Sequence, residues 1–127
     1  MRTRDVDSSK SKDFIDIAEE LMLETCDALM KCRYSAATIL AIHSTICACD
    51  ALTSSKLGKI NKSQNHLDVI PLLRKLNFIE NQQILQVQSI LSRKSESEYQ
   101  GKKIPPRDAE LVVKQSRRFL EFVRQSI

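Results

Sequence analysis

The sequence has little of what sharp turns require, since its 127 residues include only two glycines and three prolines. This scarcity disfavours a many-turned β-sandwich or β-barrel and favours a few long helices. Tryptophan is absent, and the aromatic residues are four phenylalanines and two tyrosines. Any surface that stacks on nucleic-acid bases would therefore be small. No apolar run approaches the roughly 20 residues that cross a bilayer, and the first dozen residues are polar and charged. We therefore expect a cytoplasmic protein that contacts no membrane.

The chain has the composition of an average soluble domain, with 42% hydrophobic and 28% charged residues. A chain of this length buries roughly two-thirds of the surface that its unfolded form exposes, so one core is enough. Four cysteines, Cys26, Cys32, Cys47 and Cys49, fall within 24 residues and include no Cys-x-x-Cys pair. In a reducing compartment we expect them to be small buried hydrophobes. We expect neither a metal nor a cofactor.

Apolar residues recur every three or four positions along most of the chain, which is the spacing of amphipathic helices. The pattern predicts helices over about 12–32, 35–54, 63–76 and 79–93, and a last one opened by Pro105 and Pro106. Segment 35–54 has almost no polar face, so it must be covered on most sides or form a subunit interface. The sequence thus predicts an all-α protein, with a flexible tail over 1–11 and an antiparallel bundle of four to five helices over 12–127.

Charge is distributed unevenly along the chain, whose formal net charge is +4. Residues 13–32 hold six acids against one lysine, a net charge of −5, whereas nine of the twenty bases lie between Arg93 and Arg124. A basic surface can gather phosphates by releasing counterions. The same residues could instead pair with the acidic first helix or form an ordinary solvated face. Both interpretations remain open at this point.

The most informative polar stretch is 93–101, RKSESEYQG, which follows a predicted amphipathic helix. Arg93 and Lys94 can hold phosphate and Tyr99 can stack on a base, with Lys102 and Lys103 extending the positive charge. These five residues are the predicted nucleotide- or RNA-binding site. The alternative is a helix C-terminus stabilised by a basic residue, followed by a loop whose Tyr99 packs on the bundle.

A second candidate group lies on the apolar helix, where His43, Cys47 and Asp50 are spaced to share one face. Such residues could converge on a metal. A mixed cluster on a single helix more often forms a buried polar network, so we expect His43 and Asp50 to play that structural part and to bind no metal. Glycine-rich phosphate loops and the usual hydrolase and metalloprotease motifs are absent from the sequence.

The order of these elements resembles that of the HEPN domain family, small helical bundles named for nucleotide binding in higher eukaryotes and prokaryotes. The resemblance covers roughly residues 12–126. It rests on the amphipathic first helix, Ser35–His43 continuing to Cys49–Leu52, His66 at the next helix, the stretch from Arg93 to Tyr99 and a long closing helix. It implies a bundle that commonly forms a homodimer, often with a nucleotidyltransferase or antitoxin partner in toxin–antitoxin and defence systems.

Active members of that family are metal-independent RNases that use an arginine followed, after four to six residues, by a histidine. Arg93 matches the arginine, but the histidine position falls on Glu98, Tyr99 or Gln100. A tyrosine with a pKa near 10 is a poor proton shuttle at neutral pH. The resemblance therefore implies a non-catalytic member that binds a nucleotide, an RNA or a protein partner.

Two alternatives stay open. One is an RNase toxin in which folding or dimerisation brings His43 or His66 near Arg93. The other is a plain interaction module whose apolar helix, 35–54, forms the seam of a homodimer.

Overall fold

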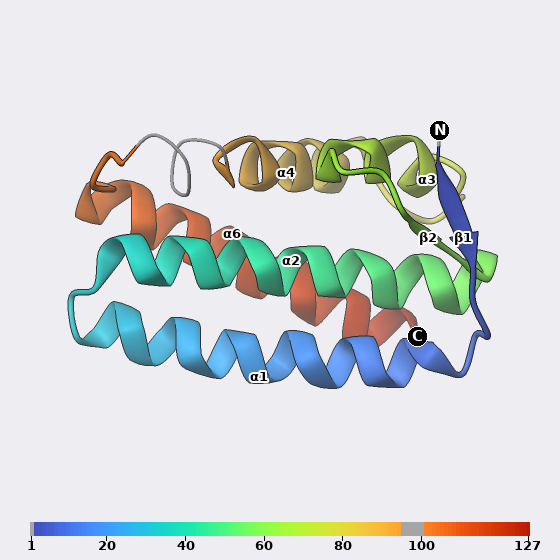
Figure 1. Ribbon diagram of the computed structural model, residues 1–127, viewed down its shortest axis with the longest axis horizontal. Helices are drawn as coiled ribbons and strands as arrows, with labels where there is room; N and C mark the ends of the chain where they lie inside the picture. Colours follow the sequence, from blue (N-terminus) through green and yellow to red (C-terminus); the bar gives the residue numbers. More distant parts are fainter. Residues whose placement is uncertain (1, 95–100) are drawn as a thin grey trace.

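The computed structural model describes residues 2–94 and 101–127, and helices make up most of this part of the chain. The long helices are α1 (Lys10–Met30), α2 (Tyr34–Leu57), α4 (Asn81–Ser92) and α6 (Pro106–Ser126). They alternate in direction along the chain, so that α1 and α4 run opposite to α2 and α6 (Figure 1). The predicted all-α bundle is confirmed.

Helix α2 forms the centre of the bundle and contacts α1, α3, α4 and α6. Small residues along it let the neighbouring helices approach closely, among them the fully buried Ala37, Ala41, Ala48 and Ala51. By length and hydropathy α2 is able to span a membrane, but 61% of its most apolar window is buried inside the fold, as in a core helix. Most of its apolar surface is therefore used within the chain, as expected for a helix covered on most sides, and a dimer seam on α2 stays a prediction.

Buried hydroxyl groups fasten α2 to its two long neighbours. The Ser44 hydroxyl donates to the carbonyl oxygen of Ala18 in α1 at 2.8 Å. On the other side, the hydroxyls of Thr45 and Ser116 lie 2.7 Å apart, and the Ser116 hydroxyl donates to the Ala41 carbonyl at 2.9 Å. Since buried polar groups are costly without partners, these contacts fix the register of the three helices.

The N-terminal segment departs from the expected flexible tail. Strand β1 (Thr3–Asp5) pairs antiparallel with β2 (Lys59–Asn61), and α1 already begins at Lys10. Gly58 ends α2 in the left-handed conformation, with φ 64°, and its carbonyl accepts from the backbone N–H of Val6 at 2.9 Å. Pairing of the backbone thus orders a segment that has little apolar surface of its own.

The third predicted helix is shorter than expected. In place of one helix from 63 to 76, the structure has a 3₁₀ turn, η1 (His66–Asp68), followed by α3 (Val69–Leu73) with Pro71 inside it. Helix α4 begins with a capping box in which Glu80 and Gln83 satisfy each other's backbone N–H groups. Pro105 and Pro106 stand at the start of α6, as predicted.

Candidate functional site

His66 stands at the end of a loop that its own polar side chains hold in shape. The Asn61 side chain accepts from the backbone N–H of Ser63 at 3.0 Å, and Ser63 Oγ accepts from the N–H of Asn65 at 3.2 Å. Asn65 then caps η1 by accepting from the N–H of Leu67 at 3.0 Å. Asn and Ser favour such local turns because their short side chains reach backbone groups two residues away. The loop therefore fixes the backbone position of His66.

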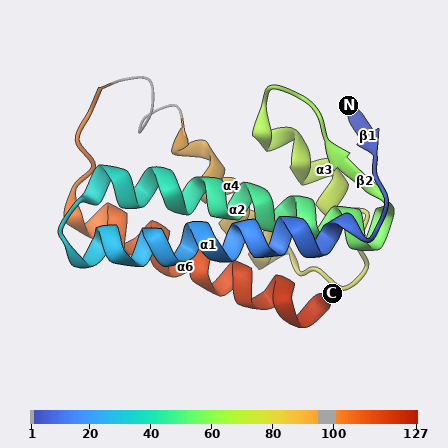
Figure 2. The ribbon, with the colours of Figure 1, turned by 60° about the horizontal axis from the view of Figure 1, so that its bottom comes forward.

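This loop and the C-terminal end of α4 border an open pocket of about 200 Å³. The two elements are in contact, and in Figure 2 the green segment leading into α3 begins beside the end of α4. An imidazole, an ammonium group, two side-chain amides and a hydroxyl converge there with two leucines. The pocket is lined by Gln64, Asn65, His66, Leu67, Leu91, Ser92 and Lys94.

A smaller cavity of about 40 Å³ adjoins this pocket and shares His66 and Leu91 with it. Its polar lining comes from Asp50 of α2, Asn61 of β2 and the same His66. A space of this size has room for water but not for a larger ligand. His66 thus borders both an open pocket and a small cavity lined by the partly buried Asp50.

Burial changes the acid–base properties of the groups along this side of α2. It raises the pKa of Asp50 to about 7, although the nearby guanidinium of Arg4 opposes the change. It also raises the pKa of the Cys47 thiol to about 11, with a further contribution from Asp50. At neutral pH the thiol is protonated, which makes it a poor nucleophile and metal ligand.

The structure separates the residues of the predicted binding site. Lys94 lines the pocket with His66, whereas the Arg93 guanidinium lies 3.8 Å from the Asp108 carboxylate in the first turn of α6. Lys102 and Lys103 are exposed on the segment before α6. Tyr99 lies outside the described residues. Of the predicted set, Lys94 is therefore the residue placed at a concave site.

His43 and Asp50, the predicted structural network, lie on the same helix but in different surroundings. Asp50 faces the small cavity with His66, while His43 is half-buried and lines neither cavity. Within residues 2–94 and 101–127, no cluster of three His, Cys, Asp or Glu side chains could hold a metal ion. All four cysteines are free thiols, and Cys32 is exposed, contrary to the expected burial.

His66 and its loop, at the centre of the pocket, were not predicted from the sequence as a binding site. The signal available was the polar stretch 61–66, NKSQNH, which is rich in residues that form tight turns. Its partners, Lys94 and Asp50, are distant in sequence, and only the packing of α4 and α2 beside η1 brings them together.

Comparison with known proteins finds a solved structure with a similar fold but no matching protein family. No protein-family model matches the sequence, and no curated protein is detectably similar to it. Among solved structures, TT1696 from Thermus thermophilus superposes with a TM-score of 0.76 and 15% sequence identity. The match covers 93% of this chain and 98% of TT1696, so the two proteins share the architecture of the whole bundle.

Proposed function

We propose that this protein is a non-catalytic, HEPN-like helical protein that binds a phosphate group of an RNA or a nucleotide in the His66 pocket. The observation that carries the proposal is the meeting of Lys94 and His66 with the polar side chains of Gln64, Asn65 and Ser92 in one concave site. An ammonium group supplies charge, and the N–H groups of the two side-chain amides supply oriented hydrogen bonds, which is the combination that phosphate oxygens require.

The size of the pocket limits what it can hold. Pockets for drug-sized ligands usually measure about 300–1,000 Å³, and this one measures about 200 Å³. It therefore suits a phosphate with part of its sugar, while the base or the rest of a strand lies outside. Leu67 and Leu91 offer apolar surface to the part of the sugar that enters.

The other predicted basic residues have supporting parts in this proposal. Arg93 links the end of α4 to the start of α6 through its ion pair with Asp108. Its guanidinium is partly buried, and the Asp108 carboxylate neutralises part of its charge. Lys102 and Lys103 are exposed and add a general positive field that favours a polyanion. A stacking role for Tyr99 remains a prediction.

Catalysis at the same pocket is the second candidate. His66 borders both the pocket of Lys94 and the cavity of Asp50, whose pKa of about 7 suits proton transfer near neutral pH. This arrangement supports an RNase in which His66 takes the place of the histidine missing after Arg93. RNA that is cleaved without added metal by the wild type, and left intact by His66→Ala, would favour this candidate.

The binding proposal is tested by fluorescence anisotropy of a labelled single-stranded RNA oligonucleotide, titrated at several salt concentrations, with ATP and AMP as competitors. We expect Lys94→Ala to weaken binding about tenfold and to lower the salt dependence by about one released ion. We expect His66→Ala to weaken it as well. Competition by the mononucleotides at low concentration would identify a nucleotide as the ligand.

The matched control is Lys75→Ala, which removes an exposed lysine that does not line the pocket. It should leave both affinity and salt dependence nearly unchanged. Equal losses in Lys75→Ala and Lys94→Ala would mean that only general charge attracts RNA, and no binding by the wild type at low salt would refute the proposal.

A further inference from the structure

A groove of about 700 Å³ runs between α1 and α6 and shares no residue with the His66 pocket. The two helices lie side by side and antiparallel in both ribbon views (Figures 1 and 2). Leu23 of α1, which lines the groove, is 72% exposed, so apolar surface is open to a ligand there. The apolar lining comes from Met22, Leu23, Cys26, Leu29, Val113 and Leu120.

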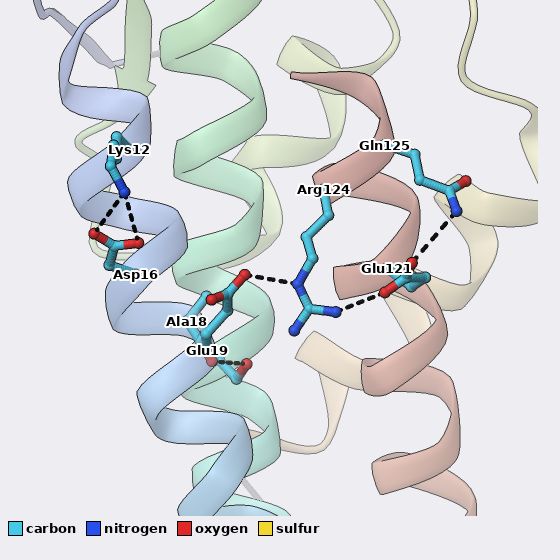
Figure 3. Close-up of polar contacts among 8 residues, drawn as sticks. Lys12, Asp16, Ala18, Glu19, Glu121, Arg124 and Gln125 are labelled. Carbon is cyan, nitrogen blue, oxygen red and sulfur yellow. Dashed lines mark hydrogen bonds and ion pairs between the residues drawn. The ribbon is translucent and has the colours of Figure 1, made fainter.

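Charged side chains close one end of the groove. The Arg124 guanidinium donates to Glu19 of α1 and to Glu121 of its own helix, each at 2.6 Å (Figure 3). The bond to Glu19 crosses from α6 to α1, and all three side chains line the groove. One guanidinium between two carboxylates leaves a net charge of −1, so this end, the Arg124 bridge, does not favour an anion.

Further along α6, three bases of the groove are free to meet an anion. Within residues 2–94 and 101–127, the structure shows no ion pair for Lys114, Arg117 or Arg118. Their spacing places them on one face of α6. Glu110, one turn before Lys114, is the acid of this part of the lining. Three bases against one acid leave a net charge of +2, which attracts an anionic group.

The separation of the two ends sets the length of a ligand. Because Glu19 contacts Arg124 and the helices are antiparallel, a step forward along α1 matches a step back along α6. Arg117 is therefore level with Cys26. At about 1.5 Å per residue, the bases from Arg117 to Lys114 lie about 10–15 Å from the Arg124 bridge. An extended alkyl chain of about 8–12 carbons, at about 1.2 Å per bond, spans this distance.

We propose that the groove between α1 and α6 binds a medium-chain fatty acid, with its carboxylate at Lys114, Arg117 and Arg118. Its tail lies over Leu23 and ends at the Arg124 bridge. A basic end joined to an apolar stretch matches one anionic head and one apolar tail, and arginine binds a carboxylate through paired hydrogen bonds. None of the described residues that line the groove is aromatic, which disfavours a nucleic acid there. The site is independent of phosphate binding at His66.

A ¹H–¹⁵N NMR titration of the full chain with decanoate and with decanol tests the basic end. We expect decanoate to bind, and decanol, which has the same tail without the charge, to bind more weakly. Arg117→Ala should weaken decanoate about tenfold and leave decanol nearly unchanged. Arg107→Ala is the matched control, because Arg107 is exposed on α6 and lies outside the groove. It should bind both molecules like the wild type.

Chain length tests the tail. From octanoate to dodecanoate we expect the affinity to rise about two- to fourfold per added methylene. Tetradecanoate should gain little more, because its tail would reach the Arg124 bridge. Leu23→Glu should weaken all of these acids, whereas Leu111→Glu, at a leucine that is 45% exposed outside the groove, should not. Circular dichroism should show all variants equally helical.

Several results would overturn the proposal. They are the absence of saturable decanoate shifts in the groove, equal affinity for decanol and decanoate, and equal losses in Arg107→Ala and Arg117→Ala. An undiminished gain from dodecanoate to tetradecanoate would overturn the position of the tail. Sedimentation equilibrium of the ligand-free chain, and flotation with vesicles of anionic lipid, test other occupants. Self-association that Leu23→Glu abolishes would assign the groove to a second copy, and binding to the vesicles without binding to decanoate would assign it to a membrane surface.

Discussion

The acidity of Asp50 depends strongly on the place of this residue in the fold. It lies on α2 beside a small cavity, with His66 of η1 lining the same space and Arg4 of β1 acting on it electrostatically. Burial disfavours the charged carboxylate more than Arg4 favours it, so the pKa rises from 3.8 to about 7. The folded protein thus holds a proton on Asp50 at acidities where the unfolded chain has lost it.

This difference predicts the direction of a pH effect. Between about pH 4 and pH 7 the folded state binds more protons at Asp50 than the unfolded state, so this carboxyl lowers stability as the pH rises through that window. Asp50→Asn replaces the carboxyl with an amide that does not titrate, so this loss of stability with rising pH should disappear. Relative to the wild type, we expect the variant to gain on the order of 2 kcal/mol in free energy of unfolding between pH 5 and pH 8.

Urea unfolding at both pH values measures this gain. Comparing the two proteins at each pH removes the contribution of groups that titrate independently of Asp50. Asp16→Asn, at an exposed carboxylate of α1, is the control and should show no such pH-dependent gain. A constant difference between Asp50→Asn and wild type from pH 5 to pH 8 would show that Asp50 has an ordinary pKa.

At the scale of elements, the long helices were predictable because each carries its own evidence. The apolar repeats of α1, α4 and α6 and the paired prolines before α6 are local signals, and the observed bounds differ from the predicted ones by a few residues. The strand pair β1–β2 and the short α3 were not predictable in this way. Strand β1 has three residues and forms because β2, which is distant in the sequence, supplies its hydrogen bonds. Helix α3 is short because Pro71 lies inside it, although the apolar pattern of the sequence continues beyond it.

Close packing around α2 predicts the effect of enlarging one of its alanines. Ala48 is fully buried, so Ala48→Leu must displace neighbouring helices, and we expect it to lower the free energy of unfolding by about 1–3 kcal/mol. Ala36→Leu makes the same change at an exposed position of α2 and should be nearly neutral, because leucine is also a good helix former. Thermal and urea unfolding compare the two. Equal stability of both variants would mean that the surroundings of Ala48 are not closely packed.

At the scale of the whole molecule, the candidate site is assembled from parts that are separate in sequence. Lys94 was predicted as a binding residue, but its grouping with His66 depends on contact between α4 and η1, and the neighbouring Asp50 arrives from α2. Periodicity locates such residues on helices without showing which helix ends meet. Arg93 shows the opposite case. It is next to Lys94 in the sequence, but the fold pairs its guanidinium with Asp108 of α6, and the sequence does not show this contact.

The most direct test of the proposed function is a ¹H–¹⁵N NMR titration of the full chain with inorganic phosphate and then with AMP, following backbone, side-chain amide and imidazole nitrogen signals. We expect saturable shifts centred on His66, Lys94 and the side-chain amides of Gln64 and Asn65. We expect the α6 bases Lys114 and Arg117 to respond weakly. Shifts confined to α6, or none at the His66 loop, would contradict a phosphate-binding pocket at this site.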